Sequence, residues 1–139
     1  MKISGKKLKM TQIFKVDRQL AITPVKIDDK DSMQEFKVGD LVKVRGLTKG
    51  KGFSGVVKRH GFHGGPKTHG QKNRHRAPGS IGSVAPQRVL PGRRMAGRMG
   101  GTNVTVKNLE IVVIEIAERL VLIKGATPGH IGANLEIKK

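Results

Sequence analysis

Arginine clusters are the feature of this sequence that most directly predicts chemistry. Residues 74–76 read Arg-His-Arg, residues 93–94 are both arginine, and Arg98 follows shortly after. Glycine, proline and serine separate the clusters, which favours extended chain between them. A guanidinium group can donate two parallel hydrogen bonds to phosphate oxygens. We therefore predict that these clusters bind a nucleic-acid backbone.

A glycine-rich motif precedes the clusters. Residues 50–55 read Gly-Lys-Gly-Phe-Ser-Gly, which fits the G-x-G-x-x-G pattern of dinucleotide-binding enzymes. That function also needs a strand before the motif, a helix after it and an acid about 20 residues later. The next acid is Glu110, so a nucleotide-dependent enzyme is the weaker alternative. Glycine also lets backbone amides approach an RNA phosphate, and Lys49 and Lys51 add charge.

Four histidines raise the possibility of a metal site, because imidazole is a common metal ligand. They are His60, His63, His69 and His75, and the chain has no cysteine and no acid between residues 41 and 109. The same lack of carboxylates leaves no group to orient a histidine for catalysis. We expect no metal site, no cofactor, no small-molecule substrate and no catalytic residue. The histidines are expected to contact phosphates or stack on nucleotides.

The charge distribution supports a polyanionic partner. The 139 residues include 28 Lys plus Arg and 10 Asp plus Glu, giving a net charge of +18, and residues 41–109 hold 15 of the basic residues and no acid. Such charges repel one another unless a polyanion neutralises them. The absence of Trp and Tyr argues against base stacking as the main mode of binding. A generic basic module that coats any duplex is the alternative.

Apolar residues predict where the core lies. Val, Ile, Leu, Met and Phe number 17 in residues 1–44 and 15 in residues 102–139, but only 11 in residues 45–101. Eleven buried side chains are too few to offset the entropy of ordering the middle segment. We predict a single domain, 1–139, with a barrel built from 1–44 and 102–139. Residues 45–101 are expected to form a basic, mostly irregular extension that a partner orders.

The terminal segments have the composition of short strands. Residues 109–123 are rich in Ile and Val and break at 117–119, which favours a strand pair over the competing single helix. A turn is expected at 38–40, and Pro24 is expected at an edge or a bulge. The pattern predicts a mainly β fold, a small closed antiparallel barrel with no convincing helix. The expected strands are 12–15, 21–27, 41–44, 104–106, 109–116 and 120–123.

No apolar stretch is long enough to span a bilayer, and the N-terminus lacks the apolar segment of a secretory signal. We therefore expect a cytoplasmic protein without membrane contact.

A series of motifs resembles one family. Residues 5–14, Gly-Lys-Lys-Leu-Lys-Met-Thr-Gln-Ile-Phe, are similar to its G-K-K-x-G-M-T-x-I-F opening, with Lys9 in place of Gly. In order along nearly the whole chain, the motifs resemble the universal third protein of the large ribosomal subunit. The other matching stretches are 35–40, 48–59, 64–66, 68–70, 75–82, 92–100, 104–109 and 124–129.

The resemblance implies a barrel of the translation-protein type and an extension that runs through ribosomal RNA toward the peptidyl transferase centre. It implies a structural, non-catalytic role in the ribosome, a part in early assembly of the large subunit, and ribosomal RNA and neighbouring ribosomal proteins as partners. Carried over by position, the inward tip lies near residues 80–88. The residues expected to bind RNA are Lys49, Lys51, Lys58, Arg59, His60, His63, Lys67, His69, Lys72, Arg74, His75, Arg76, Arg88, Arg93, Arg94 and Arg98.

The chain departs from the family pattern at three places. Residues 28–34 stand where family members carry a longer insertion, a second shortening follows residue 44, and the tip at 83–87 is one residue short. The glutamine that some members methylate has no clear counterpart. A naturally reduced protein and a deliberately shortened one both fit this pattern.

Overall fold

The computed structural model describes residues 2–15, 18–29 and 31–139, with the backbone alone for Asp31 and Ser32. The chain forms two compact units. The sheet unit comprises Met1–Lys49 and Gly101–Lys139, and the central unit comprises Gly50–Gly100. In the described part of the chain, no helix has the length and apolar character needed to cross a membrane.

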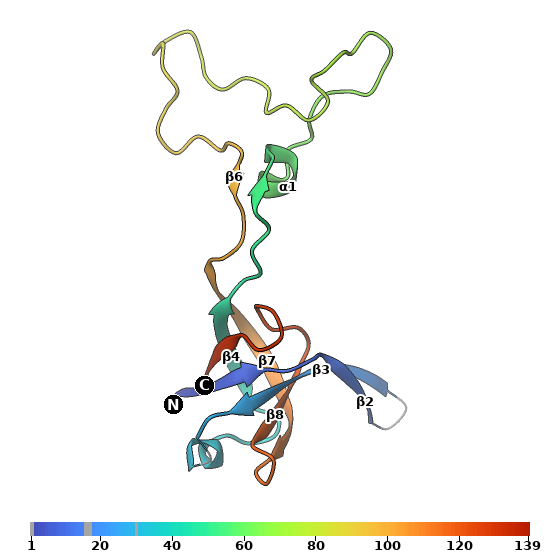
Figure 1. Cartoon of the computed structure of the whole chain (residues 1–139), viewed down its shortest axis with the longest axis vertical. Coiled ribbons are helices and arrows are strands. Elements are labelled where there is room, and N and C mark those ends of the chain that lie inside the picture. Colours follow the sequence, from blue (N-terminus) through green and yellow to red (C-terminus); the bar gives the residue numbers. More distant parts are fainter. Residues whose placement is uncertain (1, 16–17, 30) are drawn as a thin grey trace. The chain divides into compact units, whose positions relative to one another are not determined.

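The sheet unit is built on one antiparallel sheet of seven strands in the order β1-β9-β4-β7-β8-β3-β2 (Figure 1). This confirms the predicted mainly β fold. β1 also pairs with β3, but over three residue pairs against five between β1 and β9, so the ring of pairings is uneven. The elements are β1 (Lys2–Lys7), β2 (Thr11–Lys15), β3 (Arg18–Ile27), the 3-10 helix η1 (Asp31–Glu35), β4 (Leu41–Leu47), β7 (Asn103–Glu115), β8 (Leu120–Lys124) and β9 (Asn134–Lys138).

Alternation of apolar and polar residues explains these strands. In β4, Val42, Val44 and Gly46 are buried while the residues between them are exposed, as expected where one face of a strand meets a core. β1 follows the same pattern around Ile3 and Gly5. The core cluster consists of Ile3, Val25, Ile27, Met33, Phe36, Val42, Val44, Ile111, Val121, Ile123, Leu135 and Ile137.

The predicted strand pair near the C-terminus is confirmed as the β7–β8 hairpin. Glu115 pairs with Leu120 and Ile111 with Ile123, with one register shift between. Arg119 in the connecting turn has a φ of 57°, a conformation that a tight reversal of the chain can require. The competing single helix over residues 109–123 is therefore wrong. β7 also continues toward its N-terminal end through residues 104–106, which joins two strands that the sequence predicts separately.

Pro24 lies neither at a sheet edge nor at a bulge in β3. On one side it pairs with Leu122 of β8. On the other side, β3 pairs with β2 up to Ile22 and with β1 from Val25 onward. The Pro24 carbonyl accepts a hydrogen bond from the amide of Leu8. Pro24 therefore lies at the junction between two partner strands, where its missing N–H does not remove a hydrogen bond from the sheet.

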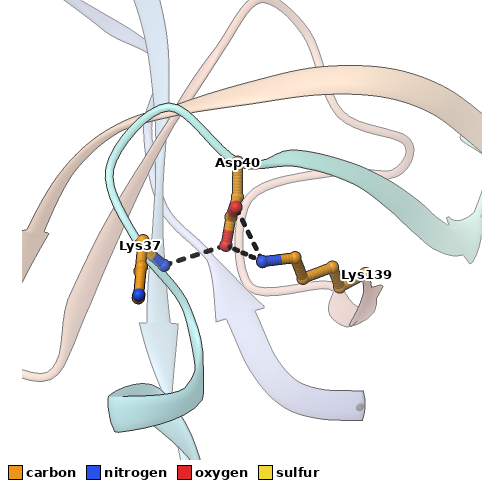
Figure 2. Close-up of polar contacts among 3 residues, drawn as sticks. All are labelled: Lys37, Asp40 and Lys139. Atoms are coloured by element: carbon orange, nitrogen blue, oxygen red, sulfur yellow. Dashed lines mark hydrogen bonds and ion pairs between the residues drawn. The ribbon is translucent and has the colours of Figure 1, made fainter.

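The turn before β4 is held by Asp40 (Figure 2). Its carboxylate accepts a hydrogen bond from the Lys37 amide at 3.0 Å and two from Lys139 Nζ at 2.7 Å. These contacts lower the pKa of Asp40, with the Lys139 hydrogen bond as the largest cause. Gly39 has a φ of 92°, which confirms the predicted turn at 38–40 and explains its glycine. Asp40 thereby ties the start of β4 to the residue after β9.

Candidate nucleic-acid interface

The two ends of the central unit are joined by a short antiparallel ladder. β5 (Phe53–Ser54) pairs with β6 (Gly97–Arg98). The ladder continues outward, since Lys51 N donates to Met99 O and Met99 N donates to Gly52 O, both at 2.9 Å. This clasp, defined as residues 51–54 with 97–99, closes the intervening segment into a loop.

A short helix follows the clasp, which corrects the expectation that the middle of the chain contains none. α1 (Val56–His60) begins after Gly55. Gly61, with a left-handed φ of 72°, forms its C-terminal cap. Its last turn is Lys58-Arg59-His60. Cations are favourable there, because the unpaired carbonyls at a helix C-terminus carry partial negative charge.

Arg59 and His60 connect α1 to the returning chain. Arg59 Nη1 donates to the Met95 carbonyl at 2.7 Å, and His60 Nε2 donates to the same oxygen at 3.0 Å. A Cβ on Gly97 would lie 2.7 Å from Arg59 Nη1, so the guanidinium packs directly on this glycine. Two of the predicted RNA-binding residues therefore also hold the central unit together.

A second loop closes between Gly64 and His75. The Gly65 amide donates to the His75 carbonyl at 2.9 Å, and His75 Nδ1 donates to the Pro66 carbonyl at 3.2 Å. Gly64 has a φ of 76°, and a Cβ there would lie 2.2 Å from the His75 oxygen. Only glycine fits this backbone crossing.

A hollow of about 770 Å³ in the central unit is lined in part by His60, Gly64 and Gly65 of these contacts. It brings together His60, His63, Arg74 and Arg94 of the predicted site. Phe62 and Gln71, which were not predicted as site residues, also line it. The His60 and Phe62 rings lie 5.9 Å apart between centroids. Phe62 could have been predicted as a site residue, because it is an aromatic residue two positions after His60 in a basic segment.

The remaining chain of the central unit is irregular. Residues 61–96 are all described and contain no helix or strand (Figure 1), and every residue from 81 to 90 is exposed. Near the predicted tip, the Arg93 guanidinium donates to the Ser80 carbonyl and Ser83 Oγ donates to the Ala85 carbonyl at 2.8 Å. The predicted tip therefore consists of exposed chain, bent by side-chain contacts to nearby carbonyls.

The predicted site residues are exposed but not all gathered in one place. Of the sixteen, His60 and His75 are half-buried and the others are exposed. Lys49 belongs to the sheet unit and the rest to the central unit. Lys51 and Arg98 lie at the clasp, and Lys58, Arg59 and His60 lie in the last turn of α1. The residues in irregular chain are His63, Lys67, His69, Lys72, Arg74, His75, Arg76, Arg88, Arg93 and Arg94.

The central unit supplies no carboxylate of its own to pair with its cations, because residues 41–109 contain no acid. The ion pairs found among the described residues join Lys2 to Glu136, Lys124 to Glu110 and Lys139 to Asp40, all in the sheet unit. In the described ranges, no three His, Asp or Glu side chains gather as a metal site would require. Within residues 50–100, only Ser54 and Val56 are buried. The arrangement thus offers exposed positive charge to a large anion.

The G-x-G-x-x-G motif does not have the surroundings of a dinucleotide site. Its last residues include β5, a two-residue antiparallel strand, and the helix after it has five residues. A dinucleotide fold needs a parallel βαβ unit with a longer helix. Gly52 instead has a φ of 64° and bends the chain into the clasp.

The chain is similar in sequence to known proteins. The family model for Ribosomal protein L3 matches residues 5–119. Large ribosomal subunit protein uL3 of Chlorobium limicola is 62% identical over 99 residues, covering 70% of this chain and 47% of that protein. The uL3 protein of Streptococcus pyogenes serotype M6 is 51% identical over 107 residues, covering 77% and 51%. The uL3 protein of Neisseria meningitidis serogroup C is 44% identical over 118 residues, covering 84% and 55%.

The chain spans about half the length of the curated relatives it matches. The matched region includes the whole central unit and most strands of the sheet unit. By this match and these identities, the chain belongs to the ribosomal protein L3 family.

Proposed function

We propose that this protein is a structural, non-catalytic component of the large ribosomal subunit that binds ribosomal RNA. The observation that carries the proposal is the exposed positive charge of the central unit. This unit contains eleven Lys and Arg residues, and no acid occurs within residues 41–109. Only Ser54 and Val56 of the central unit are buried. Crowded phosphates would neutralise these cations. The relatives named above are large-subunit proteins, which favours ribosomal RNA over other polyanions.

The proposal includes a division of the chain. The uneven ring of strand pairings in the sheet unit is compatible with a small closed barrel of the translation-protein type. Residues 45–101 would be an RNA-penetrating extension directed toward the peptidyl transferase centre, with the sixteen predicted residues on phosphates. Neighbouring ribosomal proteins would contact the sheet unit, and the protein would act in the cytoplasmic ribosome.

A generic nucleic-acid-binding module is the second candidate, because a net charge of +18 attracts any polyanion. Titration with salt and competitor RNA separates the two. Both functions predict that the logarithm of the binding constant falls linearly with the logarithm of the salt concentration. The slope should be about 0.7 to 0.9 per phosphate contact. Only the ribosomal function predicts a preference of at least about 10³-fold for a large-subunit RNA fragment over unrelated RNA of equal length and salt. Equal affinity for the two RNAs would contradict the proposal.

A third possibility, a nucleotide-dependent enzyme, would require saturable binding of a mononucleotide that Gly52→Val abolishes. We expect isothermal titration with ATP to show no saturable binding to the unmodified chain or to Gly52→Val.

A further inference from the structure

A second cationic feature lies in the sheet unit, and it shares one residue, Lys49, with the sixteen predicted RNA-binding residues. A groove of about 560 Å³ is lined by Lys7, Lys9 and Lys49, together with Thr48 and the loop that precedes β9. None of its lining residues is acidic. Three lysines around one groove without a carboxylate form a favourable position for an anion.

Lys7 is fixed in this groove by backbone contacts. Its Nζ donates to the Thr127 carbonyl at 2.6 Å and to the Gly129 carbonyl at 3.1 Å. The third donor of an ammonium group is not used by these two contacts. Burial and the nearby charge of Lys49 lower the pKa of Lys7. An anion beside Lys7 and Lys49 would stabilise the charged ammonium and so oppose this lowering of the pKa.

The loop that holds Lys7 is itself closely packed. Gly129 has a φ of 85°, and a Cβ there would lie 2.9 Å from the Leu47 carbonyl oxygen. The Gly132 amide donates to the Lys7 carbonyl at 2.7 Å, and the Lys7 amide donates to the Ala133 carbonyl at 2.9 Å. The lysine therefore lies in a preorganised position, which lowers the entropy cost of binding a ligand.

The rim of the groove is apolar. Met10 and Ile131 are 42% and 61% exposed, and both line the groove. Phosphate against lysine with sugar or base against aliphatic side chains is the combination that an RNA backbone presents. We propose that this lysine groove binds a phosphate of the RNA backbone, so that the sheet unit contributes an anion site of its own. This inference rests on the proposed function and extends it to Lys7 and Lys9.

The test compares two double variants with equal loss of charge. Lys9→Gln with Lys49→Gln removes two exposed cations of the groove, whereas Lys26→Gln with Lys43→Gln removes two exposed cations of strands β3 and β4. The affinity for a fluorescent large-subunit RNA fragment is measured by anisotropy at several salt concentrations. We expect the groove variant to bind about three- to tenfold more weakly than the control, as for two exposed ion pairs. Its salt slope should fall by about 1.5.

Two further measurements isolate the groove. Lys9→Gln alone should already weaken binding, and it leaves the Lys7 contacts intact. The pKa of Lys7, followed by carbon-detected NMR of its Cε, should rise when a short RNA oligonucleotide is added. A polyglutamate peptide of equal charge should change this pKa less than RNA does.

The outcomes separate this inference from the proposed function. If the unmodified chain prefers large-subunit RNA but the groove variant equals the control, the groove site is wrong and the proposed function stands. If polyglutamate raises the Lys7 pKa as much as RNA, the groove is not an RNA site. If the unmodified chain shows no RNA preference, the proposed function itself fails.

Discussion

At the scale of single residues, Asp40 links electrostatics to the closure of the sheet unit. It accepts hydrogen bonds from Lys37 and Lys139, and its pKa is lowered. A carboxyl whose pKa is lower in the folded than in the unfolded state stabilises the fold above its unfolded pKa. This stabilisation is lost as the pH falls through the folded value. Glu136, which pairs with Lys2 at 3.0 Å, also has a lowered pKa, chiefly because of that hydrogen bond.

Asp40→Asn should therefore lower the melting temperature at pH 7, because the ion pair to Lys139 is lost while the amide oxygen can still accept from Lys37. The drop in stability between pH 5 and pH 2 should be smaller than in the unmodified chain. Calorimetry across this pH range measures both effects. Glu118→Gln, at an exposed turn position, is the control and should change neither. An unaltered pH dependence in Asp40→Asn would show that the turn does not depend on this carboxylate.

At the scale of elements, the pairing of β1 with β3 decides whether the sheet closes on itself. Gly5 is buried in β1, and a Cβ there would lie 2.5 Å from the Lys26 carbonyl oxygen and 3.0 Å from side-chain atoms of Val25 and Ile27. No alternative position is open to the added carbon without moving one strand. The short β1–β3 pairing thus depends on a residue without a side chain.

Gly5→Ala should destabilise the sheet unit by about 1–3 kcal/mol, the usual range for overpacking a tight site. Chemical denaturation at pH 7 measures the loss. Ser4→Ala changes an exposed neighbour on the same strand and should have little effect. Equal stability of both variants would mean that β1 and β3 separate freely, and the proposed barrel would then be wrong.

The central unit requires a different test, because its cations are expected to act on RNA rather than on folding. Replacing Arg93, Arg94 and Arg98 with Ala should weaken RNA binding and lower the salt slope by about 2 to 3. The melting temperature should remain within about 2 °C, since these side chains are exposed and surface changes usually cost under about 0.5 kcal/mol. Replacing Lys15, Lys26 and Lys43 with Ala is the control for loss of charge. A large loss of thermal stability in the arginine variant would contradict the division into core and extension.

At the scale of the whole molecule, the two units differ in what stabilises them. The core cluster lies entirely in the sheet unit. In the central unit only Ser54 and Val56 are buried, and the contacts found there are backbone hydrogen bonds and hydrogen bonds from side chains to carbonyls. Exposed hydrogen bonds contribute little net free energy because water competes for the same groups. We expect the central unit to open far more often than the sheet when no partner is bound.

Hydrogen exchange tests this expectation directly. Amides from Gly61 to Gly100 should exchange rapidly in the free protein and become protected when large-subunit RNA is added. Amides of β4 and β7 should be protected in both states and act as the internal control. Strong protection of residues 61–100 without RNA would mean that this segment is stabilised by its own contacts.

The strands that follow from local residue patterns could be predicted from the sequence. Runs rich in β-branched and other apolar residues predicted strands within β2, β3, β4, β7 and β8. β1 and β9 were not predicted, because each has few apolar residues among several polar ones. Their alternating burial results from pairing between the two ends of the chain. α1 was missed because five residues between glycines carry little helical signal, and its hydrogen bonds to Met95 come from far along the chain. The lysine groove was missed for the same reason, because Lys7 and Lys49 are distant in sequence.

The clasp at residues 51–54 and 97–99 closes a loop within which the chain should tolerate proteolytic cleavage. Residues 81–90 are exposed and lie in the loop that the clasp closes, so a protease nick there would divide the seven strands of the large sheet between two fragments. The N-terminal piece would carry β1 to β4 and the C-terminal piece β7 to β9, and β4 pairs with both β7 and β9. Neither piece holds the complete apolar interior, so the fragments should remain associated as a non-covalent heterodimer and could be produced separately for complementation.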